Sequence, residues 1–289
     1  MEEIIVFGAS IGGLNYMKNQ TTYKVLAVAD NDQKKQGMDI ADGIYVILPS
    51  DIKNYNYDRI VVASMYIEGI TEQLVHELNV KPECIEYAPK RLMKTLVSSF
   101  EDQETVKFAK KVLFGLAHFL DEKNYTYYLN FGTLLGIVRE GRLLPWDDDI
   151  DITVLAKDIT DYAFRAEIQH FFKQYAIDAV FHMKVSDEEL VGIDIDLESE
   201  IVLPFTISID LARVKGEYIH LPIDKIPSQY FEQKDTIYLD GVPLFAPYPS
   251  KQYLTYVYND WETVKKNVSF MDNTTTYNEP GNMKIHTVD

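Results

Sequence analysis

The sequence predicts two consecutive domains that both combine helices and strands: a small doubly wound α/β domain at residues 1–95 and a larger α+β domain with a mixed sheet at residues 96–289. Two observations predict this division. Short β-branched segments alternate with helical patterns before residue 90, which is typical of a parallel sheet with crossover helices. An amphipathic helical pattern then begins near residue 98, and several segments of strand length follow it.

The small domain begins with a dense β-branched segment at residues 2–7, which runs into the turn Gly8-Ala9-Ser10-Ile11-Gly12-Gly13. Continuous apolar segments of this length are typical of strands that are buried on both faces of a parallel sheet. Further strands are predicted at residues 24–29 and 58–64, and a helix at residues 71–78.

The glycine-rich turn approximates the fingerprint of a dinucleotide-binding site. Gly8, Ser10, Gly12 and Gly13 follow the first strand, and Asp30 ends the second strand about twenty residues later, where an acidic residue binds ribose in such sites. These five residues are candidates for cofactor binding, although serine replaces the middle glycine. The alternative is that the glycines only allow tight packing of a helix on a strand. The domain resembles the Rossmann-like leader domains of some glycan-modifying enzymes, which implies binding of a nucleotide or sugar nucleotide.

The larger domain is predicted to open with a long amphipathic helix that ends near Lys123. Ser98 and Glu101 offer a capping box at its start, and its apolar residues keep a helical spacing. Strands are then expected at residues 127–131, 150–155, 178–183, 192–197, 205–214 and 217–221, and helices at residues 132–138, 159–175 and 250–259. The last stretch, of about fifteen residues, is polar and is predicted to form a poorly ordered tail.

The composition excludes several classes of protein. A formal net charge of −17 and a pI near 4.7 argue against binding to nucleic acid, because a phosphate backbone requires a dense Lys/Arg surface. The single cysteine, Cys84, cannot form an internal disulfide, which fits a reducing compartment. The first residues lack the cationic region of a signal peptide, and no apolar run approaches the ~18 residues of a transmembrane helix. We therefore expect a cytoplasmic protein whose contact with the inner face of a membrane, if any, is peripheral.

Four carboxylates lie within five positions of the larger domain: Asp147, Asp148, Asp149 and Asp151 directly precede an apolar strand. Two such charges ~4 Å apart repel by about 4 kcal/mol at an effective dielectric near 20, so the run requires a cation, protonation or solvent exposure. Asp149 and Asp151 leave the same face of a strand with ~7 Å between their α-carbons, so both can reach one ion. Hard oxygen ligands favour Mg²⁺ or Mn²⁺ as that ion. The alternative is an acidic loop beside a strand.

The residues before the acidic run supply the second half of a pattern. Gly132 and Thr133 lie at a predicted strand-to-helix turn, where backbone amides and a hydroxyl bind phosphate readily. An apolar-Gly-Thr turn followed by Asp-apolar-Asp on the next strand is the two-part signature of the nucleotidyltransferase fold. The sequence thus predicts a metal-dependent phosphotransferase site.

A long segment that contains this pattern is similar to the LicD family, to which fukutin and fukutin-related protein belong. It reads Gly-Thr-Leu-Leu-Gly-Ile-Val-Arg-Glu-Gly-Arg-Leu-Leu-Pro-Trp-Asp-Asp-Asp-Ile-Asp at residues 132–151, and the similarity covers residues 100–265 approximately. A second segment, Pro-Tyr-Pro-Ser-Lys-Gln-Tyr-Leu-Thr-Tyr-Val-Tyr-Asn-Asp-Trp at residues 247–261, resembles the closing segment of the family, with Asn259 where a glycine is usual.

The resemblance implies transfer of a phospho-alcohol, such as phosphocholine or phosphoribitol, from a CDP-activated donor to a sugar hydroxyl. The acceptor that it implies is a cell-surface glycan, such as a capsule or teichoic acid, or its lipid-linked oligosaccharide precursor. Two alternatives stay open: a nucleotidyltransferase that releases pyrophosphate, and a non-catalytic protein that binds a sugar nucleotide.

The resemblance also implies a third carboxylate on a neighbouring strand. Asp210 is the candidate, because an unpaired charge in its apolar strand would be costly. Asp149, Asp151 and Asp210 then form the predicted metal site, and one of Asp147 and Asp148 is expected either to deprotonate the acceptor hydroxyl or to hold the metal.

Two other pairs of charged residues have open roles. Asp194 and Asp196 form a second Asp-Ile-Asp segment, but no Gly-Thr turn precedes them, so they are predicted to lie on the solvent face of a strand. Arg139 and Arg142 are candidates for binding donor phosphates through their planar sets of N–H donors. The alternative for both arginines is an ion pair with nearby acids.

Overall fold

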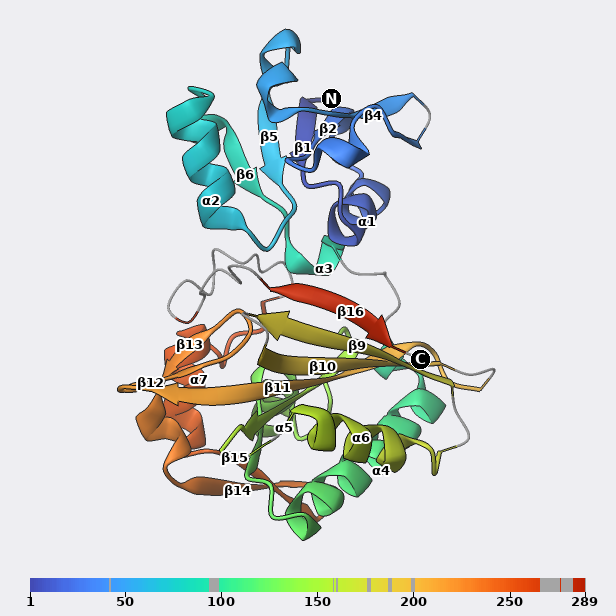
Figure 1. Ribbon diagram of the computed structural model, residues 1–289, viewed down its shortest axis with the longest axis vertical. Coiled ribbons are helices and arrows are strands. Elements are labelled where there is room, and N and C mark those ends of the chain that lie inside the picture. The colour runs from blue at the N-terminus through green and yellow to red at the C-terminus, as the bar shows by residue number, and fades with distance from the viewer. Residues whose placement is uncertain are drawn as a thin grey trace. The chain divides into compact units, whose positions relative to one another are not determined.

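The computed structural model describes residues 1–289 except residues 42, 94–98, 158, 160, 176–177, 187–188, 199–200, 266–275, 277–282 and 289 (Figure 1). The chain divides into two compact units, the first built on residues 1–96 and the second on residues 97–264. Each unit has its own sheet and its own buried apolar residues.

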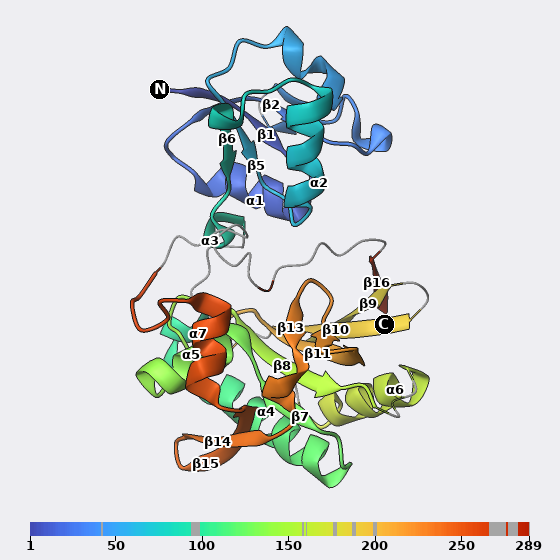
Figure 2. The same ribbon diagram turned by 90° about the vertical axis from the view of Figure 1, so that its left-hand side faces the viewer.

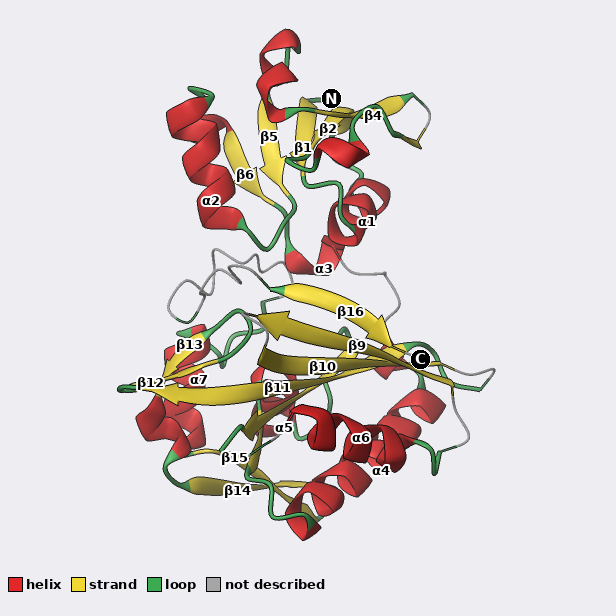
Figure 3. Cartoon of the chain, viewed as in Figure 1, coloured by secondary structure: helices red, strands yellow, loops and turns green. Residues whose placement is uncertain are grey.

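The first unit contains a six-stranded sheet in the order β3-β4-β2-β1-β5-β6, which is parallel except for the edge strand β3 (Figure 3). In chain order the parallel strands therefore lie 3-2-1-4-5, the doubly wound order of a Rossmann-like domain. The prediction of this fold is confirmed. The strands are β1 Glu3–Phe7, β2 Lys24–Ala29, β3 Asp39–Ala41, β4 Ile44–Ile47, β5 Arg59–Val62 and β6 Ile85–Tyr87, and the helices are α1 Ile11–Asn19, α2 Ile67–Glu72 and α3 Lys90–Met93.

The second unit contains a mixed sheet. Strands β13, β12, β11, β10, β9 and β16 follow one another as antiparallel neighbours, β8 pairs with β11 in parallel, and β7 is antiparallel to β8. The strands are β7 Tyr127–Leu129, β8 Asp149–Leu155, β9 Asp178–Ser186, β10 Glu189–Glu198, β11 Phe205–Lys215, β12 Tyr218–His220, β13 Lys225–Pro227, β14 Lys234–Leu239, β15 Val242–Pro247 and β16 Lys284–Val288. The helices are α4 Gln103–Glu122, α5 Phe131–Glu140, α6 Asp161–Phe172 and α7 Ser250–Tyr258.

The central strands of this sheet have one apolar face and one polar face, because successive side chains of a strand point to opposite faces. Helices α4 and α6 lie side by side against the apolar face (Figures 1 and 2), where Phe119 meets Phe171 and Phe172 meets Phe181 of β9. The acidic side chains Asp149 and Asp151 share the other face with residues of β9, β10 and β11. The amphipathic pattern therefore decides which face of the sheet carries the acidic side chains.

Two local predictions need correction, and one hairpin was not predicted. Asp102 caps α4, since its carboxylate accepts the Thr105 amide at 2.8 Å, while Ser98 of the expected capping box lies outside the described residues. Residues 284–288 of the expected disordered tail form β16, which pairs with β9 and so satisfies backbone groups along that strand. The β14–β15 hairpin was not expected, although Asp240-Gly241, with positive φ at both residues, is a strong hairpin signal.

None of the helices in the described part of the chain is long and apolar enough to cross a membrane.

Candidate active site

The turn between β7 and α5 is fixed by one buried asparagine. The Asn130 side-chain oxygen accepts the Phe131 amide at 2.8 Å and the hydroxyl of Tyr253, and its amide group donates to Thr153 of β8 at 2.8 Å. Phe131 takes a φ of 39°, which is unfavourable for a bulky residue and persists only where surrounding contacts hold it. The turn is therefore a rigid element that joins α5, α7 and β8.

Asp151 binds directly to this turn. Its carboxylate accepts the Gly132 amide at 3.1 Å, and its own amide donates to the Thr133 hydroxyl at 2.8 Å. Thr133 is only 2% exposed. The amide and the hydroxyl that were predicted to bind phosphate thus hold Asp151 in place.

Gly132 is required because two carboxylates converge on it. A Cβ at this position would collide with Asp147 Oδ2 and would lie 3.6 Å from Asp151 Oδ2. The glycine therefore lets the Asp147 carboxylate approach the beginning of α5, and a larger residue would push that carboxylate aside.

The acidic run itself forms a compact group of ligands. Carboxylate oxygens of Asp147, Asp148 and Asp149 all lie within 4.8 Å of one another, and the three residues are half-buried. Oxygens bound to one Mg²⁺ or Mn²⁺ at about 2.0–2.6 Å can be up to about 5 Å apart, so this donor set fits a hard divalent cation. The loop is held from both sides, because the Asp147 amide donates to the Leu144 carbonyl and the Thr206 amide of β11 donates to the Asp148 carbonyl.

Asp210 lies outside this group and interacts with Lys184 of β9. Its Oδ1 is 2.7 Å from the Lys184 ammonium, and in the strand register it lies opposite Thr153, two residues beyond Asp151. Burial raises the pKa of Asp210 despite the opposing charge of Lys184. Burial alone would lower the pKa of Lys184, but the charges of Asp210 and Asp194 raise it overall, so the amine stays protonated. The predicted role of Asp210 as a metal ligand stays a prediction.

The second Asp-Ile-Asp segment is divided between two environments. Asp196 is 55% exposed at its side chain and contacts His182 at 2.9 Å, whereas Asp194 contacts Lys184 at 2.9 Å and is partly buried. Only Asp196 lies at the solvent face in the predicted way.

Both arginines form an ion pair with Glu140, which is the alternative that the sequence left open. The Arg139 side chain is 10% exposed, donates to the Trp261 carbonyl at 3.1 Å and lies over the Trp146 ring. The Arg142 side chain is 59% exposed and shares Glu140 with Arg139. Arg139 therefore links α5 to the closing segment, and only Arg142 is accessible to a ligand.

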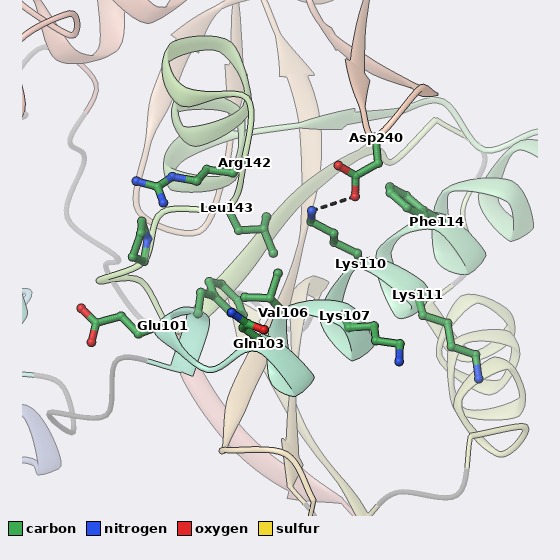
Figure 4. Close-up of a pocket in the computed structure, with 12 residues that line it drawn as sticks. Glu101, Gln103, Val106, Lys107, Lys110, Lys111, Phe114, Arg142, Leu143 and Asp240 are labelled. Atoms are coloured by element: carbon green, nitrogen blue, oxygen red, sulfur yellow. Dashed lines mark hydrogen bonds and ion pairs between the residues drawn. The ribbon is translucent and has the colours of Figure 1, made fainter.

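A groove of about 770 Å³ lies between α4 and the segment that precedes the acidic run (Figure 4). Leu143 and Pro145 form one wall, and α4 forms the other. Three lysines of α4 and Arg142 give its rim positive charge, although Lys110 is already paired with Asp240 at 2.7 Å. Pro145 precedes Asp147 by two residues, but none of the carboxylates of the acidic run is among the described residues that line the groove.

Sequence reasoning missed three residues of this region. Tyr253 of α7 is buried and Tyr258 is partly buried, and desolvation followed by the nearby charge of Asp151 raises the pKa of Tyr258 well above its ordinary value. Lys184 is 7% exposed although it lies within a strand. The signal for Lys184 was its alternation with Phe181, Met183 and Val185, which places it on the polar face.

The glycine-rich turn of the first unit is occupied by its own aspartate. Asp30 accepts the Ala9 amide at 2.7 Å and pairs with Lys35 at 3.0 Å. Gly8 has a φ of 123°, and a Cβ on Gly13 would collide with the Gly8 carbonyl oxygen. These contacts favour the packing role of the glycines.

The other two residues of that predicted site also have structural positions. Ser10 is the N-cap residue of α1 without a side-chain capping bond, and a Cβ on Gly12 would lie 3.1 Å from Met93 of α3.

Residues 124–249 match the family described as LicD/FKTN/FKRP, nucleotidyltransferase domain. The second unit carries a LicD-family domain. Residues 1–85 match the family described as C2185-like, N-terminal. The LicD match supports a transferase domain of the phospho-alcohol or nucleotidyl type in general.

Similarity to individual proteins is more distant. An uncharacterized protein of Rickettsia typhi is 24% identical over 151 residues, so the match spans 50% of this chain and 43% of that relative's length. The solved structure of ANT(2″)-Ia in complex with adenylyl-2″-tobramycin is 18% identical, with a TM-score of 0.35 over 59% of this chain and 84% of that one. An oxidoreductase from Agrobacterium radiobacter in complex with NAD⁺, L-tartaric acid and magnesium is 11% identical, with a TM-score of 0.28 over 95% of this chain and 92% of that one.

Proposed function

We propose that the LicD domain transfers a phospho-alcohol, such as phosphocholine or phosphoribitol, from a CDP-activated donor to a hydroxyl of a cell-surface glycan or its lipid-linked precursor. The observation that carries this proposal is the convergence of Asp147, Asp148 and Asp149 beside Gly132, where Asp151 also lies. Such a concentration of carboxylates at the beginning of a helix suits a site that holds a cation against a phosphorylated donor.

Asp149 and Asp151 would hold Mg²⁺ or Mn²⁺ together with Asp147 or Asp148. When bound, the ion supplies compensation for the negative charge of the donor phosphates. The chain's own contribution is geometric: Asn130 fixes the turn, and the Gly132 amide and Thr133 hydroxyl fix Asp151. Asp210 is not included among the ligands of this proposal, because its Oδ1 contacts Lys184.

In the proposed reaction the acceptor hydroxyl oxygen attacks the phosphorus that bears the alcohol. The bond from that phosphorus to the bridging oxygen of the CDP moiety breaks, and CMP leaves with the electron pair. One of Asp147 and Asp148, whichever is not a ligand, takes the hydroxyl proton. The groove between α4 and residues 142–145, with its apolar wall and cationic rim, is the proposed place for the acceptor, because Pro145 precedes the acidic run by two residues.

The test combines the purified full chain with Mn²⁺ or Mg²⁺, a panel of CDP-alcohols and oligosaccharide acceptors. Release of CMP and a mass increase of the acceptor by one phospho-alcohol are expected. Asp149→Asn should abolish both, while Asp121→Asn, an exposed carboxylate at the end of α4, should change neither. Release of pyrophosphate from a nucleoside triphosphate instead would establish the nucleotidyl type, and donor binding without turnover would establish a non-catalytic protein.

A further inference from the structure

Lys184 is a buried cation on the polar face of the sheet that carries the acidic run. It comes from the middle of β9, which lies beside β10 and then β11 (Figure 1). Along the register, Lys184 lies opposite Gly192, and Gly192 lies opposite Asp210. The side chain therefore reaches across β10 to β11, toward the strand that pairs with β8.

The ammonium group of Lys184 has three acceptors within hydrogen-bond distance. Asp210 Oδ1 lies at 2.7 Å, Asp194 Oδ1 at 2.9 Å and Ser208 Oγ at 3.2 Å. An ammonium has three N–H donors and no acceptor, so these contacts use its whole capacity. Lys184 therefore has no donor left for a substrate phosphate, and its role is directed at the carboxylates.

Gly192 of β10 leaves the space through which the Lys184 side chain crosses this strand. A Cβ at position 192 would lie 2.6 Å from Lys184 Cε and 3.0 Å from Asp210 Oδ1. The absence of a side chain on the middle strand leaves a channel through which the lysine chain passes to Asp210. Lys184 of β9, Asp194 of β10, and Ser208 and Asp210 of β11 thus form a cluster of contacts across three strands.

The cluster adjoins the acidic run. Ser208, which donates to Asp194 at 2.7 Å and accepts from Lys184, lies directly opposite Asp151 in the parallel pair of β8 and β11. Without Lys184, the carboxylates of Asp194 and Asp210 would face each other on the same polar surface as Asp151. Such a set of hard oxygens would itself suit a divalent cation.

We propose that Lys184 takes the place of a second divalent ion: its ammonium binds Asp194 and Asp210 and thereby confines the metal to the acidic run at Asp147–Asp151. Lys184 is a positioning residue in this arrangement. The inference rests on the proposed metal site, and it assigns that site one ion.

The test measures bound Mn²⁺ by electron paramagnetic resonance, with the full chain and without any donor or acceptor. We expect wild type and Asp210→Asn each to bind one Mn²⁺ ion. The Mn²⁺ affinity of Asp210→Asn should differ from that of wild type by less than about tenfold, which is the smallest loss typical of a residue that supports a metal ligand without binding the metal. Asp149→Asn should weaken binding by more than about 100-fold, because it removes a ligand. Lys184→Met should bind a second ion, and the double variant Lys184→Met/Asp210→Asn should bind one.

Two results would overturn the inference: two ions in wild type, or loss of the single ion in Asp210→Asn. One ion in a folded Lys184→Met would overturn it as well. Near-ultraviolet circular dichroism shows whether Lys184→Met folds. If it does not, the inference is tested by Asp210→Asn and Asp194→Asn, which must both bind one Mn²⁺ ion as wild type does. The number of bound Mn²⁺ ions is measured without turnover, so it tests the inference even if the proposed reaction fails. An altered number of bound ions together with normal CMP release would reject the inference but not the proposed function.

Discussion

In both strand-to-helix turns of this chain, an aspartate carboxylate accepts a backbone amide of the turn, but the two aspartates have different roles. In the first unit, Asp30 at the end of β2 accepts the Ala9 amide of the turn at 2.7 Å. In the second unit, Asp151 on β8 accepts the Gly132 amide at 3.1 Å. Both aspartates satisfy an amide at the beginning of a helix, where negative charge is favourable.

The difference between the two turns is the charge around the aspartate. Asp30 is paired with Lys35 at 3.0 Å, so the first turn is close to electrically balanced. Asp151 lies next to a run of three more carboxylates, whose oxygens gather within 4.8 Å. A carboxylate at a glycine turn is thus a packing device in one unit and part of a candidate ion site in the other, and the neighbouring charges decide which.

The largest expected difference between the turns is in catalysis. Asp149→Asn should lower phospho-alcohol transfer by about a thousandfold, because the several kcal/mol that a bound metal supplies correspond to about three powers of ten in rate. Asp30→Asn should leave the rate within about threefold of wild type, since it lies in the other turn. The measurement is CMP release under saturating donor, and equal loss in the two variants would break the comparison.

The second expected difference is in ligand binding. A CDP-alcohol at 100 times its dissociation constant, together with Mn²⁺, should stabilise the second unit by about 2.7 kcal/mol. Both tryptophans, Trp146 and Trp261, lie in that unit, so their fluorescence during urea unfolding reports on it alone. NAD⁺ or a sugar nucleotide should produce no heat in calorimetric titration, because the Ala9 amide is already bound to Asp30. A saturable heat would restore the dinucleotide-binding role of the first turn.

The glycines of the two turns should respond in opposite ways to alanine. In Gly13→Ala the new methyl meets the Gly8 carbonyl oxygen, which is backbone and cannot move aside, so the first unit should lose about 1–3 kcal/mol of stability. In Gly132→Ala the methyl meets the movable end of the Asp147 side chain, so the unit should stay folded but bind Mn²⁺ more weakly. Hydrogen exchange of the first unit and Mn²⁺ titration would distinguish these effects. Unchanged Mn²⁺ affinity in Gly132→Ala would contradict the convergence of ligands on that glycine.

The smallest expected effect concerns the buried hydroxyl that holds the second turn. Tyr253→Phe removes a donor to Asn130, which should cost about 1 kcal/mol at pH 7. Burial raises the pKa of Tyr253 well above its ordinary value, so its contribution is complete below pH ~10 and is lost as the pH rises further. At pH 11 the wild type should have lost about 1.4 kcal/mol through this group, a loss that the variant does not share.

Urea unfolding followed by tryptophan fluorescence at pH 7 and pH 11 measures both values. The difference in stability between wild type and Tyr253→Phe should therefore shrink or change sign at pH 11. Tyr258→Phe is the matched control, because burial raises the pKa of Tyr258 in the same direction but Tyr258 does not bind Asn130. A constant difference across pH would show that Tyr253 ionises as easily in the folded chain as in the unfolded one.

Much of the fold was readable from local patterns. The apolar segments at Glu3–Phe7 and Asp149–Leu155 and the helical spacing of Gln103–Glu122 all appear as the sequence predicts, because each carries its periodicity within a few residues. The strand Lys284–Val288 was missed, since its order comes from pairing with β9, a partner about a hundred residues away. The cap at Asp102 shows the same limit on the scale of one turn, because the bond from the Thr105 amide to its carboxylate forms only in the folded turn and was not predicted.

The sequence by itself determined the chemistry that is available: four carboxylates after a Gly-Thr turn, whose residue types and spacing indicate a hard-cation site and a LicD-type domain. Only the tertiary structure decided which of these groups meet. It brought Asp147 to Gly132 and placed Lys184 against Asp210, residues that are 15 and 26 positions apart in the chain. The physical reason is that strand register and turn geometry fix the distance between distant side chains, and the interaction between charges depends on that distance.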